Sequence, residues 1–269
     1  MKKQKKYVRR ISPHNVFVLP LVIFLIVMVV VPLILLFVRA FSFDGGFSFA
    51  NFSAVFTDGI SLRILFRSIG IAALAATVCL IIGYPIAYGL AILGFRKTYT
   101  ILLLFLMPMW VNLLLRSIGL QRIFQLLGMP HEGLLPLVIA IVIDYLPLMI
   151  LPLYVVLSGV SKKYIEASAD LGANGWQTFR RTILPLSLPG VVAGFLLVFT
   201  PAVSTYFLAR FFGNNQTRMI GQVLFDLFSR SGTWGRGSVV AILLLVIVVF
   251  AFVLTSLLSR RKNKRGGLW

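Results

Sequence analysis

The sequence predicts an all-α membrane protein with six transmembrane helices, on the strength of three observations. Apolar residues make up 59% of the 269 positions, charged residues only 12%, and the mean hydropathy is +0.97. A typical soluble domain is about 45–50% apolar and about 25% charged, and a chain of this size cannot hide such an excess in one core. The apolar residues gather in six long stretches, and basic residues gather between alternate stretches. A soluble enzyme, a disordered chain and a secreted disulfide scaffold are therefore excluded.

Each stretch is close to the roughly 20 residues that a helix needs to cross a hydrocarbon core of about 30 Å. The expected spans are residues 16–38, 68–94, 98–115, 134–158, 187–209 and 238–258. Strands of a membrane barrel would be about 10 residues long and would alternate in polarity, unlike these stretches. The sequence thus divides into a basic tail at 1–15, a membrane domain at 16–258 and a second basic tail at 259–269.

The basic residues predict the orientation, with both termini in the cytoplasm. Seventeen of the 26 Lys and Arg, including all nine Lys, then lie on the cytoplasmic side, in agreement with the positive-inside rule. An even number of spans also requires the termini to share a side. The first span follows a basic tail as a signal peptide would, but its run of 23 residues is long and no small-residue cleavage pattern follows it. We interpret it as a retained anchor rather than a cleaved leader.

The sequence shows no pattern for catalysis, metal binding or ATP binding. Its single cysteine, Cys79, lies inside an apolar stretch, and His14 and His131 lie in different flanks. No Gly is followed by Lys, so the Walker A pattern is absent. We therefore expect no catalytic residue, no cofactor and no metal site, and any energy must come from a partner. The net charge of +19 is explained by the orientation, so we expect no nucleic-acid partner.

The long loop at 159–186 has more signals of ordered structure than a linker needs. A first short helix is expected at 162–171, with Gly172 suited to the left-handed position that follows a helix. Asn174 and Gln177 have the spacing of a capping box for a second helix. The apolar face of that helix would be formed by Trp176, Phe179 and Ile183. One interpretation is a hairpin that lies on anionic lipid headgroups through Lys162, Lys163, Arg180 and Arg181.

The loop also resembles the EAA loop of the membrane subunits of ABC importers. That pattern reads Glu-Ala-Ala, three residues, Gly, nine residues, then Ile, any residue, Leu and Pro. The matching positions here are Glu166, Ala167, Ser168, Gly172, Thr182, Leu184 and Pro185, of which Ser168 and Thr182 depart from the pattern. In that family the loop docks into a cytoplasmic ATPase subunit. The resemblance therefore implies a set of coupling residues: Glu166, Ala167, Ser168, Leu171 and Gly172.

Four other segments narrow the resemblance to one branch of the ABC importers. They are residues 83–88, 108–116, 144–154 and 219–221, and they resemble the first permease family of the spermidine/putrescine importers. The resemblance implies a type I importer permease fold in a prokaryotic plasma membrane and a polyamine cargo. It also implies three kinds of protein partner: a second related permease, two ATPase subunits and an external polyamine-binding protein.

Five residues are candidates for the translocation path: Trp110, Asn112, Asp144, Tyr145 and Tyr206. Asp144 is the only ionisable residue inside an expected span, where an isolated carboxylate costs about 2.5–3.5 kcal/mol. It either meets an ammonium group of the cargo or makes a structural hydrogen bond to Asn112 or to a partner chain. The aromatic rings either hold a cation, at about 0.5–2 kcal/mol each, or anchor the chain at the membrane interface.

The expected outer loops carry nine Arg against four acidic residues, a balance that repels a free polycation. Either a separate binding protein captures the cargo, or the cargo is not a cation. Two other classes of function compete with the importer. A self-contained secondary carrier or channel often shows inverted repeats and more charge within the membrane. A membrane-embedded enzyme needs paired carboxylates, clustered His or an activated nucleophile, which one Asp and two separated His do not supply.

Overall fold

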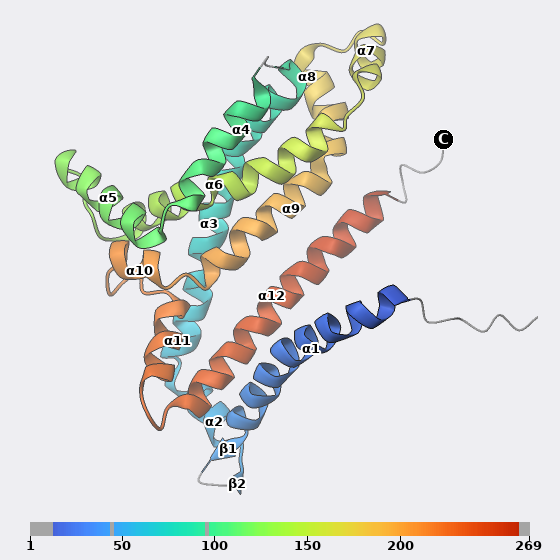
Figure 1. The fold of residues 1–269 in the computed structure, drawn as a ribbon. Coiled ribbons are helices and arrows are strands. Elements are labelled where there is room, and N and C mark those ends of the chain that lie inside the picture. The colour runs from blue at the N-terminus through green and yellow to red at the C-terminus, as the bar shows by residue number, and fades with distance from the viewer. Residues whose placement is uncertain (1–12, 44–45, 95–96, 264–269) are drawn as a thin grey trace, which may run out of the picture.

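A computed structural model describes residues 13–43, 46–94 and 97–263, which form a helical bundle (Figure 1). Within these residues, five helices are long and apolar enough to cross a membrane, and a bent pair makes a sixth crossing if it counts as one span. The five long helices are α1 (Pro13–Ala40), α3 (Ile60–Tyr88), α6 (Leu134–Ser158), α9 (Leu184–Val203) and α12 (Trp234–Asn263).

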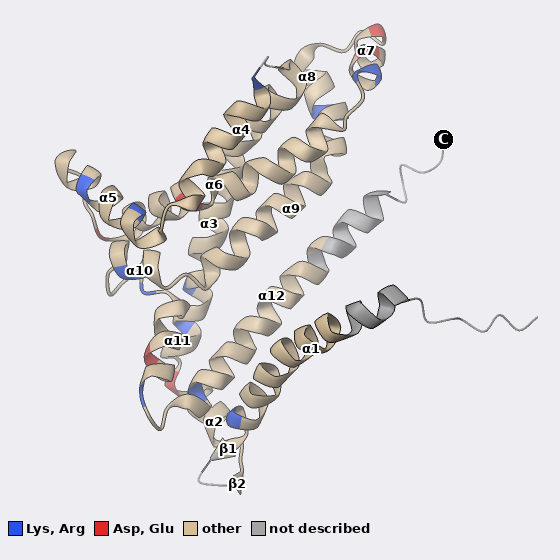
Figure 2. Cartoon of the chain, viewed as in Figure 1, with Lys and Arg blue, Asp and Glu red and all other residues tan. Residues whose placement is uncertain are grey.

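The bundle has two distinct ends. Figure 1 places the 159–186 loop at one end and α2 (Ala50–Asp58) with α11 (Ile220–Ser229) at the other. The beginning of α1 and the end of α12 both point away from the end that holds α2. Figure 2 shows charged residues at both ends and on α5 and α10, whereas the described parts of α1, α9 and α12 carry none over most of their length.

The core is formed by α3, α6 and α9, which cross at small residues. Gly190 and Gly194 of α9 have the Gly-x-x-x-Gly spacing that lets membrane helices approach closely. A Cβ added to Gly190 would lie 3.0 Å from Val156 Cβ, and one added to Gly194 would lie 2.7 Å from Met149 Sδ, both on α6. Gly83 of α3 faces the same part of α6, where an added Cβ would lie 3.1 Å from Met149 Cγ. Close packing of this kind holds helices together in lipid, where apolar burial supplies no driving force.

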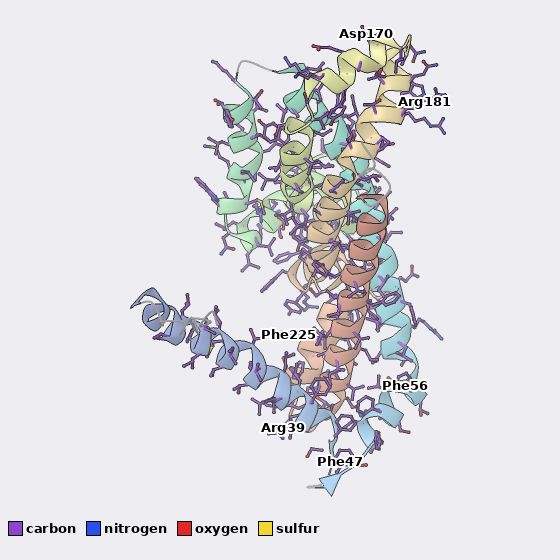
Figure 3. The ribbon with its side chains drawn as sticks, turned by 90° about the vertical axis from the view of Figure 1, so that its right-hand side faces the viewer. Arg39, Phe47, Phe56, Asp170, Arg181 and Phe225 are labelled. Carbon is purple, nitrogen blue, oxygen red and sulfur yellow. The ribbon has the colours of Figure 1, made fainter. Side chains whose placement is uncertain are left out.

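α1 stands apart from this core and packs mainly on α12. Figure 3 shows α1 leaning away from the other helices, and every residue from Pro20 to Val31 is exposed. Because this helix is apolar on all sides, its surroundings must be lipid or another membrane helix.

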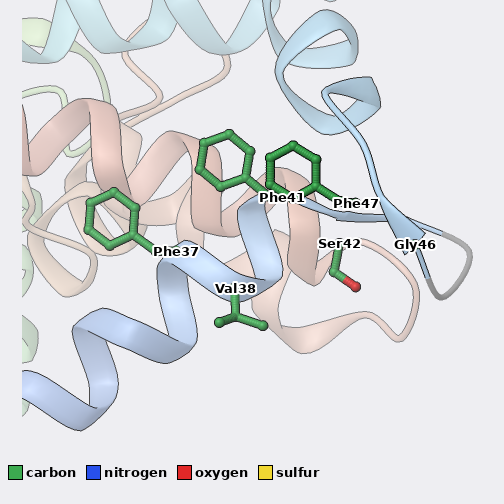
Figure 4. Close-up of a pocket in the computed structure, with 6 residues that line it drawn as sticks. All are labelled: Phe37, Val38, Phe41, Ser42, Gly46 and Phe47. Atoms are coloured by element: carbon green, nitrogen blue, oxygen red, sulfur yellow. The ribbon is translucent and has the colours of Figure 1, made fainter.

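A pair of short antiparallel strands, β1 (Ser42–Phe43) and β2 (Gly46–Phe47), follows α1. The strands and the end of α1 line a pocket of about 410 Å³ that contains three Phe side chains (Figure 4). The rings of Phe41 and Phe47 stack with centroids 5.3 Å apart. Asn51 of α2 fixes this region, because its Nδ2 donates to the carbonyl oxygens of Ala40 and Ser42 at 3.2 and 3.0 Å.

The third expected span, at 98–115, is broken rather than a single straight helix. α4 (Thr98–Leu106) is followed by a 3₁₀ turn, η2 (Met107–Trp110), and α5 (Leu113–Leu126) then bends away by 98°. Pro108 explains the break, because proline lacks the N–H that the helix ladder requires and its ring clashes with the preceding turn. Asn112 begins the new helix, since its Oδ1 accepts a hydrogen bond from Leu114 N at 2.8 Å.

The other five expected spans correspond to long helices whose ends differ. Residues 134–158 are helical as expected, whereas the second span begins at Ile60 and continues through a π-helical turn, η1 (Gly89–Leu93). The fifth ends at Val203 rather than at 209, and a separate short helix, α10 (Phe207–Phe212), follows. α12 continues to Asn263, so it includes the first residues of the tail expected at 259–269. The remaining tail residues, 1–12 and 264–269, lie outside the described residues.

Candidate functional site

The 159–186 loop folds into two short helices, as expected. Ser161 caps α7 (Lys162–Asp170), because its side chain accepts a hydrogen bond from Lys163 N at 3.4 Å. Gly172 ends that helix with a φ of +80°, in the left-handed region that glycine favours. α8 (Gly175–Thr178) begins with the expected capping box, in which Asn174 Oδ1 accepts from Gln177 N at 2.8 Å and Gln177 Oε1 accepts from Asn174 N at 3.0 Å.

Four of the five candidate coupling residues face outward from this hairpin. Glu166, Ala167, Leu171 and Gly172 are exposed, and Leu171 reaches 89% exposure. Ser168 is half-buried, and its Oγ lies 3.1 Å from Thr178 Oγ1, in a hydrogen bond that joins α7 to α8. The departure from the family pattern at Ser168 thus adds an internal contact. The exposed Glu166 carboxylate and the almost fully exposed Leu171 side chain are both available to a partner.

The expected apolar face of the second loop helix forms only in part. Ile183 is 1% exposed and Phe179 is half-buried, but Trp176 is 67% exposed and stacks on Phe179 with centroids 5.4 Å apart. Phe179 also meets the rings of Tyr84 and Tyr88 on α3. The loop is therefore attached to the bundle through its second helix. Figure 3 shows Asp170 and Arg181 at this end, opposite Phe47 and Phe56.

Asp144 forms an ion pair with Arg116. Arg116 Nη2 lies 2.8 Å from Asp144 Oδ1, and the side chain of Asp144 is 9% exposed. The structural alternative considered for Asp144, a hydrogen bond to Asn112, is not seen among the described residues; Asn112 Oδ1 instead caps α5. Arg116, which was expected outside the third span, lies on α5, and the bend after α4 brings it against Asp144 in the middle of α6. Pro108 was the sequence signal that could have indicated this bend.

A cavity of about 270 Å³ opens beside the ion pair. Arg116, Asp144 and Ser117 line it together with apolar side chains of α5, α6 and α10. Arg116 Nε is buried and has no hydrogen-bond partner among the described residues. The guanidinium therefore keeps an unused donor, and the carboxylate keeps an oxygen that Arg116 does not occupy. Such a pair can hold a small polar or cationic group beside it.

The aromatic candidates for the path have different surroundings. Trp110 is 83% exposed at the end of η2, whereas Tyr145 is half-buried on α6. Tyr206 stacks on Phe225, with centroids 4.4 Å apart and an interplanar angle of 27°. The Phe207 ring also meets Tyr206, with centroids 5.0 Å apart at 72°, so aromatic neighbours cover much of the surface that a cation could use.

Some Arg residues of the expected outer loops are paired within the chain. Arg218 forms an ion pair with Asp226, and Arg39 Cζ lies 5.7 Å from the centroid of the Trp234 ring. Others are exposed: Arg63, Arg210, Arg230 and Arg236. In the part of the chain that the structure describes, no group of three or more His, Cys, Asp and Glu is placed to hold a metal.

The sequence matches a known protein family and is similar to two curated transport proteins. Residues 13–264 match the family described as "Binding-protein-dependent transport system inner membrane component". The chain is 30% identical over 263 residues to the spermidine/putrescine transport system permease protein PotB of Haemophilus influenzae, which covers 88% of this chain and 92% of that protein. It is 28% identical over 240 residues to the permease protein PotC of the same system and organism, with 87% and 92% covered.

The fold is similar to that of a bacterial alginate ABC transporter, solved in complex with an alginate pentasaccharide-bound periplasmic protein. The TM-score is 0.74, and the similarity covers 92% of this chain and 94% of that chain. The sequence identity is 13%, so this comparison concerns the fold alone.

Proposed function

The chain belongs to the binding-protein-dependent transport system inner membrane component family, and we propose that it is a permease subunit of a polyamine importer. It is a membrane-spanning permease subunit of an ATP-driven importer, and a self-contained carrier or channel does not fit this family. The observation that carries the polyamine proposal is the 30% identity to a spermidine/putrescine permease over 88% of the chain. We assign to this chain half of a translocation path for spermidine and putrescine in a bacterial inner membrane.

The partners follow from the same comparisons. The chain is similar to both PotB and PotC, which supports a second, related permease as the other half of the path. The similarity in fold to an importer solved with its periplasmic protein supports an external binding protein. The absence of a Walker A pattern in this sequence supports a separate ATPase as the source of energy, and we propose two copies of it.

The ATPase docks on the 159–186 loop at the cytoplasmic face. Glu166, Ala167, Leu171 and Gly172 form the contact, since all four are exposed. Ser168 holds the two loop helices together beneath that contact. This placement puts both termini and the loop in the cytoplasm. The distribution of Lys and Arg supports it, as do the directions of the outer ends of α1 and α12 (Figure 1).

The cargo passes close to the Arg116–Asp144 pair. An ammonium group can bind the Asp144 oxygen that Arg116 leaves free, and Trp110, Tyr145 and the uncovered part of the Tyr206 ring can hold further cationic groups. Asn112 contributes by fixing the bend that brings Arg116 to this place. Exposed Arg side chains on the outer side repel a free polycation, which is why a binding protein must deliver the cargo.

Uptake by the complete assembly tests the cargo. Both permeases, the ATPase and the binding protein are reconstituted in proteoliposomes, and labelled spermidine uptake is measured with ATP. Unlabelled putrescine and spermidine are expected to compete with it, whereas an amino acid or a sugar is expected not to. ATP-dependent uptake of a non-cationic solute without uptake of any polyamine would contradict the proposed cargo and leave the permease role intact.

Charge reversal at Glu166 tests the docking contact. Glu166→Lys is expected to lower uptake at least about tenfold, because a buried interface contact of a charged group is worth about 1.5–3 kcal/mol. Glu132→Lys is the matched control, since it makes the same change on an exposed residue outside the loop. Co-purification of the ATPase is measured alongside uptake. Equal loss of uptake in both variants, or no loss in either, would contradict the role of Glu166.

A further inference from the structure

Phe179 lies where the 159–186 loop meets the bundle, and three aromatic rings surround it. The Tyr84 ring meets it edge to face with centroids 5.7 Å apart at 87°, and the Tyr88 ring does so at 5.9 Å and 84°. Trp176 stacks on it from the loop side at 5.4 Å and 23°. Offset-stacked and edge-to-face arrangements are the favoured geometries of aromatic pairs. Phe179 thus connects the loop directly with the end of α3.

Tyr84 also joins α3 to α9 through a hydrogen bond. Its hydroxyl oxygen lies 2.7 Å from Ser187 Oγ, and Ser187 donates its own proton to the Leu184 carbonyl oxygen at 3.1 Å. Tyr84 is therefore the donor to Ser187. Both side chains are buried, Tyr84 at 8% and Ser187 at 0% exposure. Because a buried hydroxyl without a partner is unfavourable, this pair fixes the position of α3 against α9.

Both helices depart from regular α geometry at this point. The π-helical turn η1 begins directly after Tyr88, and a second π-helical turn, η3 (Phe179–Ile183), begins at Phe179 itself. Single π-helical turns inside helices are rare and occur mostly at functional sites. The aromatic contact therefore joins two irregular turns, one at the loop end of α3 and one at the beginning of α9.

We propose that Tyr84, Phe179 and Ser187 are positioning residues that transmit movement of the 159–186 loop to α3. The inference rests on the proposed function, because the docked ATPase is the source of the movement. A displacement of the loop reaches Phe179 through Trp176 and passes to α3 through the tyrosine rings. The Tyr84–Ser187 hydrogen bond makes α9 follow. Since α3, α6 and α9 cross at glycines in close contact, the three helices then move together.

Removal of single hydroxyl groups tests this link without removing any ring. Tyr84→Phe and Ser187→Ala break the hydrogen bond and keep the side-chain packing. Tyr99→Phe is the matched control, because it removes the same group from a tyrosine of α4 that is 78% exposed. The complete importer is reconstituted in proteoliposomes at equal amounts of assembled complex. Spermidine uptake and ATP hydrolysis are then measured in the same vesicles, and their ratio is the readout.

Tyr84→Phe and Ser187→Ala are each expected to lower the number of spermidine molecules imported per ATP by about threefold to tenfold. This factor corresponds to the usual strength of a hydrogen bond between membrane helices. The double variant is expected to lose no more than the larger single loss, and Tyr99→Phe is expected to keep the wild-type ratio. A purely structural role would lower the amount of assembled complex and leave the ratio unchanged. An unchanged ratio in Tyr84→Phe therefore overturns the link.

Failure of the proposed cargo is distinguishable from failure of the link. If the wild-type importer hydrolyses ATP but imports no polyamine, the cargo assignment fails, and stimulation of ATP hydrolysis by the binding protein becomes the readout. The link then predicts weaker stimulation in Tyr84→Phe than in Tyr99→Phe. Equal stimulation in these two variants overturns it in that case as well.

Discussion

The ion pair between Arg116 and Asp144 limits the substitutions that these two positions can accept. A carboxylate within a membrane span costs about 2.5–3.5 kcal/mol. A guanidinium 2.8 Å away offsets that cost, so each charge is acceptable only because the other is present. The pair joins α5 to α6, and its geometry depends on the bend at Pro108.

Removal of one partner should therefore lower the free energy of unfolding more than removal of both. Arg116→Leu leaves the Asp144 carboxylate buried without a partner, and we expect the free energy of unfolding to fall by about 3 kcal/mol, the lower end for broken buried pairs. The double variant Arg116→Leu/Asp144→Leu is expected to recover most of this loss. The thermal midpoint of the detergent-solubilised importer, followed by size-exclusion chromatography, measures both effects.

Uptake by the same double variant tests whether Asp144 also contacts the cargo. If the carboxylate binds an ammonium group, the double variant assembles normally but imports spermidine at least about tenfold more slowly, since a hydrogen bond to a charged group is worth about 1.5–3 kcal/mol. Wild-type uptake by a stable double variant would limit the pair to a structural role.

The amide side chains of Asn51 and Asn112 act in opposite ways, one as a hydrogen-bond donor and the other as an acceptor. Asn51 donates through Nδ2 to the carbonyl oxygens at the end of α1, whereas Asn112 accepts through Oδ1 at the beginning of α5. We expect Asn51→Asp to lower the free energy of unfolding by about 2–3 kcal/mol, because the carbonyl groups lose their donor and face a carboxylate. Asn112→Asp keeps the acceptor at a helix N-terminus, where a negative charge is favourable. Equal thermal midpoints for the two variants would contradict this distinction.

At the scale of elements, the sequence predicts those helix ends that hydropathy and capping residues determine. The helix at 134–158 is bounded by Gly133 and Gly159, and the loop helices are bounded by Ser161, Gly172 and Asn174, so hydropathy and capping residues suffice for both. Residues 98–115 are predominantly apolar, and hydropathy does not distinguish a straight helix from a broken one. The ion pair between residues 116 and 144 depends on that bend, which is why the sequence did not reveal it.

The contact between α9 and α6 leaves little room for a larger side chain at Gly190. Gly190→Leu places a side chain where even a Cβ would lie 3.1 Å from the Pro152 carbonyl oxygen. We expect it to lower the free energy of unfolding by at least about 1–3 kcal/mol, the usual cost of overpacking. Gly70→Leu on α3 is the control, because an added Cβ there meets nothing within 4 Å. The yield of monodisperse importer and its thermal midpoint measure both variants, and equal loss in both would contradict close packing at Gly190.

At the scale of the whole molecule, the distribution of Lys predicts which end of the fold faces the cytoplasm. Lys residues are confined to the loop and tail segments that the positive-inside rule assigns to the cytoplasm. The fold separates the 159–186 loop from the end that holds α2, β1 and β2 (Figure 1). If the loop receives an ATPase, the opposite end must face the binding protein. The orientation of the chain is therefore the premise of both proposed docking events.

Labelling of introduced cysteines tests that orientation with a control that the chain itself provides. Cys79 is 0% exposed, with Sγ 3.8 Å from the Val142 carbonyl oxygen, so a membrane-impermeant maleimide is expected not to label the unmodified chain. Thr57→Cys on α2 is expected to react in right-side-out vesicles, and Lys163→Cys on α7 only in inverted vesicles, since both positions are exposed at opposite ends of the bundle. The reverse labelling pattern would place the loop outside the cytoplasm, where no ATP-hydrolysing subunit could reach it. That result would contradict both the coupling role of Glu166 and the link through Phe179.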